Sequence, residues 1–130
     1  MTITDAHERL VKKELSAEEL TRGCLDEIKK RDGEIHAYLE VFDDALDSAR
    51  AIDAKGDFSH PLAGIPLGIK DVLFIKGKRV GAASKMLEGY IAPYEATSIG
   101  LLRKAGAVFL GRTNTDEFTM GVSTETSAWA

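Results

Sequence analysis

The stretch that decides the fold is residues 61–75, PLAGIPLGIKDVLFI, which is apolar apart from glycine, proline and one adjacent pair of charged residues. Its β-branched residues predict a strand over residues 67–72 that is buried on both faces, as in a parallel or mixed sheet. Residues 108–110 predict a second buried strand, and a short helix over residues 97–106 precedes it. Strand, helix and strand with short connections are typical of an α/β fold.

The other residues after position 60 are predicted to form turns and loops around these elements. We expect a turn at Gly77 and a loop over residues 81–96. A further turn over residues 111–114 and a helical turn over residues 116–120 follow the second strand. Residues 61–130 are therefore predicted to form the start of an α/β core.

Residues 1–60 differ in composition from the rest of the chain. They carry nine basic and 15 acidic side chains, whereas residues 61–130 carry eight basic and six acidic ones. Nine of the 12 glycines and all three prolines lie after residue 60. The composition predicts an acidic helical layer with one strand, joined to a glycine-rich α/β part, and the two together form one incomplete domain.

Three helices and one strand are predicted in this acidic layer. The first helix is predicted to be capped by Thr4 or Asp5. The second is predicted to begin after Ser16 and end at Gly33, and the third to begin at Asp43 or Asp44 and end at Gly56. Ser16 and Glu19 have the spacing of a capping box. Apolar and polar residues alternate over residues 35–41, which predicts a half-buried strand.

Bulk composition excludes several classes of protein. The chain has 130 residues, a net charge of −4 and no apolar run near the roughly 18 residues that a membrane helix needs. Its polar N-terminus, MTITDAHERL, is unlike a secretory signal. The single cysteine, Cys24, has no partner for a disulfide or a metal site, which predicts a reducing, cytoplasmic location. A net acidic chain without a basic run is also a poor candidate for a nucleic-acid binder.

Lys70 is the residue that an ordinary apolar strand does not explain. Burial among Ile69, Val72 and Leu73 would lower the pKa of its ammonium, and a neutral lysine amine is a competent general base. Alternatively, Lys70 extends to water from the end of the strand. Asp71 is a poor partner for Lys70, because adjacent strand residues point to opposite faces.

Other motifs give weaker signals. Gly64, Gly68 and Lys70 do not have phosphate-loop spacing, and Ser123 lacks the second glycine of a nucleophile elbow. The three histidines are scattered and share no metal-ligand spacing. The segment TNTDEFTMGVSTETS, residues 113–127, is rich in hydroxyls and carboxylates, which suits either a turn lining a polar cleft or a solvated loop.

Three stretches resemble the amidase signature family: PLAGIPLGIKD, GAASKMLEGYIAPYEAT and LLRKAGAVFLGRTNTDEFTMGVSTETSAW. The run DEFTMG followed by STETSAW is most similar to the branch that serves the amidotransferases of aspartyl- and glutamyl-tRNA. The resemblance covers almost the whole chain. It implies the N-terminal part of the amidase signature fold, in which a helical front is followed by strands of a mixed sheet covered by helices.

The resemblance also implies roles for individual residues. The family uses a triad of serine, cis-serine and lysine, and the lysine of its IKD motif is the base, a role that carries over to Lys70. Burial in the apolar strand would then explain how the amine stays neutral. The MGVST segment resembles a loop beside the substrate pocket, so Met120, Gly121 and Ser123 are candidate substrate-binding residues, with a purely structural role as the alternative.

The family's function is implied in the same way. It is glutamine hydrolysis, with the ammonia delivered to a partner subunit that activates misacylated tRNA using ATP and Mg²⁺. This chain is expected to bind no cofactor or metal directly, to contact no membrane, and to meet tRNA only through the complex. Two alternatives stay open: a fragment of a stand-alone amidase for another amide, and a non-catalytic interaction module.

We expect the isolated chain to hydrolyse neither glutamine nor simple amides. The family's two serines belong to a Gly-Gly-Ser-Ser-Gly-Gly-Ser segment that follows the position of Ala130, and this sequence contains no such segment. The chain is thus expected to be an N-terminal fragment with a base and no nucleophile. Ammonia release by the pure chain, abolished by Lys70→Ala, would contradict this expectation.

Overall fold

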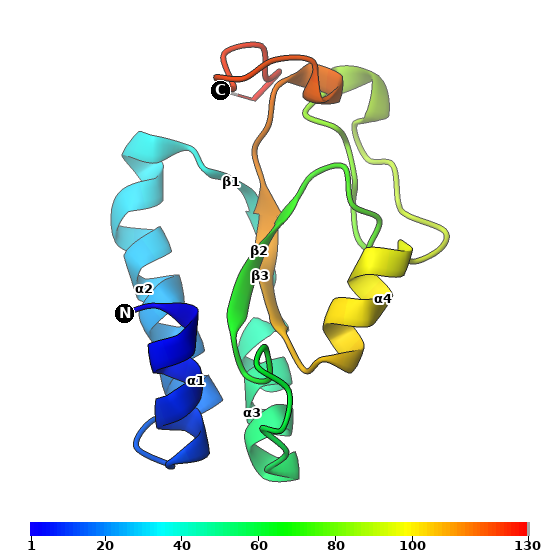
Figure 1. Cartoon of the computed structure of the whole chain (residues 1–130). Helices are drawn as coiled ribbons and strands as arrows, with labels where there is room; N and C mark the ends of the chain where they lie inside the picture. Colours follow the sequence, from blue (N-terminus) through cyan, green and yellow to red (C-terminus); the bar gives the residue numbers. More distant parts are fainter. Residues whose placement is uncertain (130) are drawn as a thin grey trace.

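The structure is a computed structural model that describes residues 1–129, and it forms a mixed α/β fold around a three-stranded sheet. The elements in chain order are α1 (Ile3–Val11), α2 (Ala17–Ile35), β1 (Tyr38–Val41), α3 (Ala45–Lys55), β2 (Pro66–Lys70), the 3-10 turn η1 (Lys85–Leu87), α4 (Thr97–Lys104), β3 (Val108–Thr113) and the 3-10 turn η2 (Glu117–Thr119). Helices α1 and α2 lie on one side of the sheet, and α4 lies on the other (Figure 1). The predicted fold class is confirmed.

The last strand along the chain is the middle strand of the sheet. The strand order is β1-β3-β2, with β2 parallel and β1 antiparallel to β3. Lys70 of β2 and Tyr38 of β1 are both aligned with Thr113 of β3. The carboxyl ends of β2 and β3 therefore lie at the same edge of the sheet, where the loops after both strands gather (Figure 1).

The two faces of the sheet are covered by separate apolar clusters. One cluster joins α1, α2 and α3 to the sheet, with Leu10, Ala17, Ala49 and Val108 buried in it. The other joins the sheet to α4 and consists of the buried side chains of Phe42, Ile69, Ile75, Ile99, Ala107 and Phe109. Burial of these side chains supplies the main driving force for closing the helices onto the sheet.

The burial predicted for the two core strands is right for β3 and wrong for β2. Residues 108–111 of β3 are all buried, because this strand is covered on both faces and paired on both edges. In β2, Ile69 is buried whereas Gly68 and Lys70 are exposed. Strand β2 is an edge strand of the described sheet, and the face that carries Gly68 and Lys70 is open to solvent.

The turn predicted over residues 111–114 is also wrong, because β3 continues to Thr113. Gly111 is paired with Val41 in this extension. A Cβ atom at position 111 would overlap the backbone carbonyl of Glu40. Glycine therefore serves here for the close approach of β1 to β3 and not for a turn.

The predicted boundaries of the N-terminal helices are partly confirmed. The Ser16 side chain accepts a hydrogen bond from the backbone N–H of Glu19 at 3.0 Å, and the Glu19 carboxylate accepts one from the Ser16 N–H at 2.8 Å. The third helix runs from Ala45 to Lys55 and ends at Gly56, as predicted. The first helix, however, is capped by Thr2 in a capping box with Asp5, not by Thr4 or Asp5.

Helix α2 does not end at Gly33. It continues to Ile35, and His36 takes the left-handed conformation at its C-terminus with a φ of 54°. The Asp32 carboxylate accepts hydrogen bonds from the backbone N–H groups of Ala37 and Tyr38 at 2.7 and 3.2 Å. These contacts fix the exit of the chain from α2, so β1 begins at Tyr38 and not at Ile35.

Neither a membrane span nor a metal cluster is found in residues 1–129. No helix in this range combines the length and the apolar character that a membrane crossing requires. The same residues contain no group of three or more His, Cys, Asp or Glu side chains placed to hold a metal ion.

Two glycine-to-alanine substitutions should shift the stability in opposite directions. Gly111→Ala should lower the free energy of unfolding by about 2 kcal/mol or more, because the new Cβ forces β1 away from β3. Gly100→Ala should raise it by about 0.5–1 kcal/mol, because this α4 glycine has open space around its Cα and alanine is the better helix former. Urea denaturation of both variants tests this, and equal effects would contradict the pairing of β1 with β3.

Candidate functional site

Lys70 is the last residue of β2, at the carboxyl end of the parallel strand pair. Its side chain is exposed, so the expectation that the apolar strand desolvates its ammonium is wrong for the described residues. Strand alternation is the reason: Ile69 points into the core, and Lys70 lies on the opposite, open face of β2.

The buried charge at this strand end belongs to Asp71. Asp71 is only 1% exposed, and its carboxylate forms an ion pair with the Arg112 guanidinium. The same carboxylate accepts hydrogen bonds from the backbone N–H groups of Gly81 at 3.0 Å and Ala83 at 2.9 Å. Asp71 thus pairs with Arg112 and not with Lys70, as strand geometry predicts.

Arg112 connects this buried carboxylate to β1. Its side chain is 13% exposed, and its Nε donates to Glu40 Oε2 at 2.9 Å. Arg79 lies on the outer side of the same glutamate, with its Nε 3.9 Å from Glu40 Oε2. Two guanidinium groups and two carboxylates therefore alternate across the sheet, from the loop after β2 to β1.

The segment after β3 folds around a second carboxylate, that of Asp116. It accepts hydrogen bonds from the backbone N–H groups of Ser123, Thr124 and Thr126 at 3.0–3.2 Å and from the Thr126 hydroxyl at 2.8 Å. These bonds, with that from the Thr124 N–H the strongest, hold the pKa of Asp116 below its ordinary value of 3.8. We call residues 116–128 the Asp116 loop.

The three candidate substrate-binding residues all lie in the Asp116 loop. The Met120 side chain is 76% exposed, and Gly121 and Ser123 are exposed as well. A Cβ at position 121 would overlap the Asp116 carboxylate, so the loop can close only with glycine there. The Ser123 hydroxyl donates to Glu125 Oε2 at 2.7 Å.

Lys70 and the Asp116 loop share one edge of the sheet but are not in direct polar contact. Lys70 is the last residue of β2, and the Asp116 loop follows the carboxyl end of the parallel strand β3 (Figure 1). In residues 1–129, no hydrogen bond or ion pair joins Lys70 to Met120, Gly121 or Ser123. The structure therefore gathers the candidate residues at one edge without assembling them into a closed pocket.

A cavity of about 290 Å³ lies beside the Glu40–Arg112 pair. Residues of β1, the loop after β2, β3 and the residue after the Asp116 loop surround it, including Tyr38, Arg79, Ser84, Arg112 and Trp129. The buried Ser84 hydroxyl donates to Glu117 Oε1 at 2.6 Å, and this hydrogen bond joins the loop after β2 to η2. None of the four residues that the sequence singled out lines this cavity.

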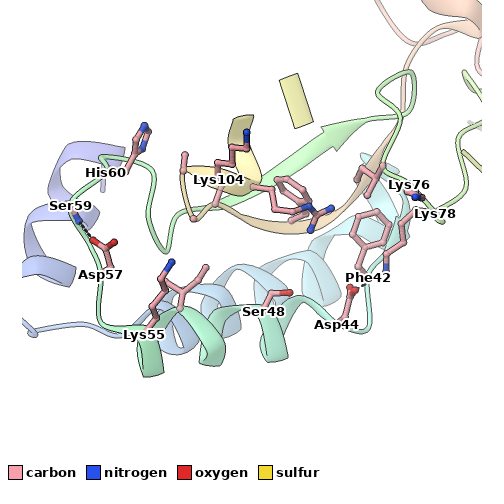
Figure 2. A pocket seen from close by; sticks show the side chains of 17 residues that line it. Phe42, Asp44, Ser48, Lys55, Asp57, Ser59, His60, Lys76, Lys78 and Lys104 are labelled. Carbon is pink, nitrogen blue, oxygen red and sulfur yellow. Dashed lines mark hydrogen bonds and ion pairs between the residues drawn. The ribbon is translucent and has the colours of Figure 1, made fainter. Parts of the chain in front are cut away.

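A larger groove of about 480 Å³ lies between α3, α4 and the start of β3 (Figure 2). Five cationic side chains line it: Lys55, Lys76, Lys78, Arg103 and Lys104. Figure 2 shows Lys55 at one end of α3 and Lys76 and Lys78 at the other end of the groove. The groove is separate from Lys70 and the Asp116 loop, which contribute no lining residue.

Most of the positive charge in this groove has a local structural role. Lys78 pairs with Asp44 at 3.0 Å and lies over the Phe42 ring. Arg103 forms two hydrogen bonds to Glu95 and lies over the Phe109 ring. Lys55 and Lys104 lie in the last turns of α3 and α4, where a cation stabilises the exposed helix carbonyls. These contacts account for Lys55, Lys78, Arg103 and Lys104 without a ligand.

Sequence reasoning missed Asp71, Arg112 and Asp116 as organising residues. A signal was present for Asp71, because an acidic residue in an apolar run needs a partner as much as a lysine does. Its partner was hidden by the early end predicted for the second strand, which placed Arg112 in a turn. Asp116 gave no signal, because three of the four hydrogen bonds to its carboxylate come from backbone N–H groups.

The family profile described as Amidase matches residues 19–130. The chain therefore belongs to the amidase family, and the resemblance to amidase signature proteins is confirmed. It is similar to the A-subunit of glutamyl-tRNA(Gln) amidotransferase from Cutibacterium acnes, with 48% identity over 99% of this chain and 26% of that protein. The protein of the same name from Acidothermus cellulolyticus is 51% identical over 90% of this chain and 24% of that protein.

Solved structures show the same relationship. The peptide amidase of Stenotrophomonas maltophilia matches with a TM-score of 0.84 and 33% identity, over 91% of this chain and 25% of that chain. The A-subunit of the glutamyl-tRNA(Gln) amidotransferase from Thermotoga maritima matches with a TM-score of 0.72 and 33% identity, over 99% of this chain and 26% of that chain. This chain spans about a quarter of the length of the curated relatives it matches.

The stability of the Asp116 loop should depend on pH. Because the pKa of Asp116 is lowered in the folded chain, its ionised carboxylate stabilises the loop fully above pH 3.8, and this contribution is lost as the pH falls through the folded-state pKa. Amide-exchange protection of Ser123, Thr124 and Thr126 should therefore be retained above pH 3.8 and be lost as the pH falls through the lowered pKa of Asp116.

Asp116→Asn provides the direct check of this dependence. This variant should show low protection of the same amides at neutral pH and no acid transition of its own. Asp43→Asn, at an exposed carboxylate before α3, should behave like the native chain. An unchanged acid transition in Asp116→Asn would assign the effect to another group.

Proposed function

We propose that this chain is the N-terminal part of a glutamine-hydrolysing amidase that supplies ammonia to a tRNA amidotransferase. The observation that carries the proposal is 48% identity over 99% of the chain to a protein named as the A-subunit of glutamyl-tRNA(Gln) amidotransferase. Several relatives of that name from other bacteria match over at least 89% of the chain. In this proposal the partner subunit, and not this chain, uses ATP and Mg²⁺ to activate misacylated tRNA in the cytoplasm.

Lys70 is the general base in the proposed reaction. The lysine takes a proton through the cis-serine from the nucleophilic serine, whose oxygen attacks the amide carbonyl of glutamine. The amide C–N bond then breaks, ammonia leaves with a proton returned along the same path, and water releases glutamate from the acyl-enzyme. Both serines belong to the segment that amidases carry after the region matched by this chain.

The exposed position of Lys70 is compatible with this role. The proposed serine-bearing segment packs against the open face of β2 that carries Gly68 and Lys70. Such a contact removes water from the lysine amine, and a desolvated neutral lysine is a competent general base. In the same proposal, Met120, Gly121 and Ser123 line the substrate pocket from the Asp116 loop.

A second candidate is an amidase that acts on another amide. A peptide amidase matches this chain with a TM-score of 0.84 over 91% of its residues. This match supports the alternative, because it covers almost as much of the chain as the matches to the amidotransferase A-subunits do. The sequence of the gene beyond codon 130 tests the shared part of both proposals. A Gly/Ser-rich segment with the two serines would support an amidase, and its absence would contradict both candidates.

Lys70→Arg should abolish glutamine hydrolysis in a hybrid enzyme. The hybrid joins residues 1–130 to the remaining part of the Cutibacterium acnes protein, expressed with its partner subunits. Arginine keeps the positive charge but stays protonated, so activity should fall at least about 100-fold. Ammonia release from glutamine and from a panel of other amides measures both the rate and the substrate class.

Lys76→Arg is the matched control for this substitution. Lys76 is also exposed and lies six residues further along the chain, so its replacement should leave the rate near normal. Near-normal turnover in Lys70→Arg would show that position 70 supplies only a charge. An inactive native hybrid would contradict the proposed function itself.

A further inference from the structure

A continuous set of hydrogen bonds leads from the end of β2 to the Asp116 loop. It begins at Asp71, the residue directly after Lys70, whose backbone N–H donates to the Thr113 carbonyl at 3.2 Å. The Asp71 carboxylate then accepts from the N–H groups of Gly81 and Ala83, and the Asp71 carbonyl accepts from the Ala82 N–H at 2.8 Å. One buried residue thus binds three consecutive N–H groups of the same turn.

This turn has a conformation that alanine rarely adopts. Ala82 and Ala83 have φ angles of 48° and 49°, in the left-handed region that favours glycine. Two successive alanines in this region cost free energy, so the turn needs contacts that over-determine it. The three bonds to Asp71 are such contacts, and both alanines are buried beside it.

The other side of the turn holds the Asp116 loop. The Ala82 carbonyl accepts from the Phe118 N–H at 2.9 Å, and the Ala83 carbonyl accepts from the Ala128 N–H at 3.0 Å. The N–H groups of the turn face Asp71 while its carbonyls face the loop that carries Met120, Gly121 and Ser123. The position of the loop relative to β2 is therefore set through Ala82 and Ala83.

We propose that Asp71 is a positioning residue that fixes the Asp116 loop relative to Lys70 by holding the Ala82–Ala83 turn in its left-handed conformation. Asp71 itself is buried and paired with Arg112, so its proposed effect passes through the turn. Its catalytic consequence rests on the proposed function, since only there does the loop line a substrate pocket. Its structural consequence can be measured in this chain alone.

Amide exchange of the chain tests the structural part. Asp71→Asn keeps the size of the side chain, but its amide NH₂ faces donors that previously met a carboxylate oxygen. Exchange of the Phe118 and Ala128 N–H groups should accelerate at least about 10-fold, together with that of Ala83. Asp44→Asn, which removes the ion pair to Lys78 at another part of the chain, should leave these amides unchanged.

A double variant separates positioning from general stability. In Asp71→Asn/Ala83→Gly, glycine adopts the positive φ at position 83 without strain, so protection at Phe118 and Ala128 should largely return. Unchanged exchange at Phe118 and Ala128 in Asp71→Asn would overturn the proposal. Failure of both variants to fold would assign Asp71 to overall stability and would overturn it as well.

Kinetics of the hybrid enzyme test the catalytic part. Asp71→Asn should raise KM for glutamine about 10-fold, with a smaller loss in kcat and an unchanged pH profile, because Lys70 is untouched while the pocket loop moves. A shifted pH profile with normal KM would mean that Asp71 acts on the base, which contradicts loop positioning. An inactive native hybrid would count against the proposed function, while the exchange experiment still decides the role of Asp71.

Discussion

The buried carboxylate of Asp71 is the constraint on which the carboxyl edge of the sheet depends. Moving an ionised carboxylate out of water costs roughly several kcal/mol of free energy, unless a counter-charge and hydrogen-bond donors replace the lost water. Here the counter-charge comes from Arg112 on β3, and the donors come from Gly81 and Ala83. Strand β3 and the turn at residues 81–83 must therefore both be in place before Asp71 is satisfied. A single charge thus joins segments 41 residues apart in the chain.

The same arrangement explains how irregular backbone is held at this edge. The loop after β2 and the Asp116 loop contain little helix or strand, yet each is folded around a carboxylate that accepts several backbone N–H groups. An ionised acceptor makes stronger hydrogen bonds than a neutral carbonyl, so one side chain can replace a strand partner. Lys70, in contrast, is left exposed on the neighbouring position, where a further packing surface can reach it.

Some local signals in the sequence predicted local structure, although the caps at Thr2 and His36 were missed, and long-range pairs were beyond such signals. The capping box of Ser16 and Glu19 and the end of α3 at Gly56 depend on residues within one helical turn, so both were predicted correctly. Gly111 was misread as a turn because its role is to admit the Glu40 carbonyl of another strand. The apolar run around Lys70 and Asp71 could not show which charge is buried, since the answer depends on Arg112. The family was predicted from short motifs that need no such geometry.

The place of β3 in the sheet has a consequence for how the chain folds. Strand β3 follows β1 and β2 in the chain, and in the described sheet it is the strand with which both of them pair. Tyr38 of β1 pairs with Thr113, which lies 75 residues later in the chain. The sheet therefore has a high contact order, whereas the contacts within the capped helices are local. On the ribosome, β1 and β2 leave the exit tunnel as unpaired edges and stay so until Thr113 emerges. We therefore expect chaperones to meet the nascent chain in this interval, at the apolar strand that begins with Pro66.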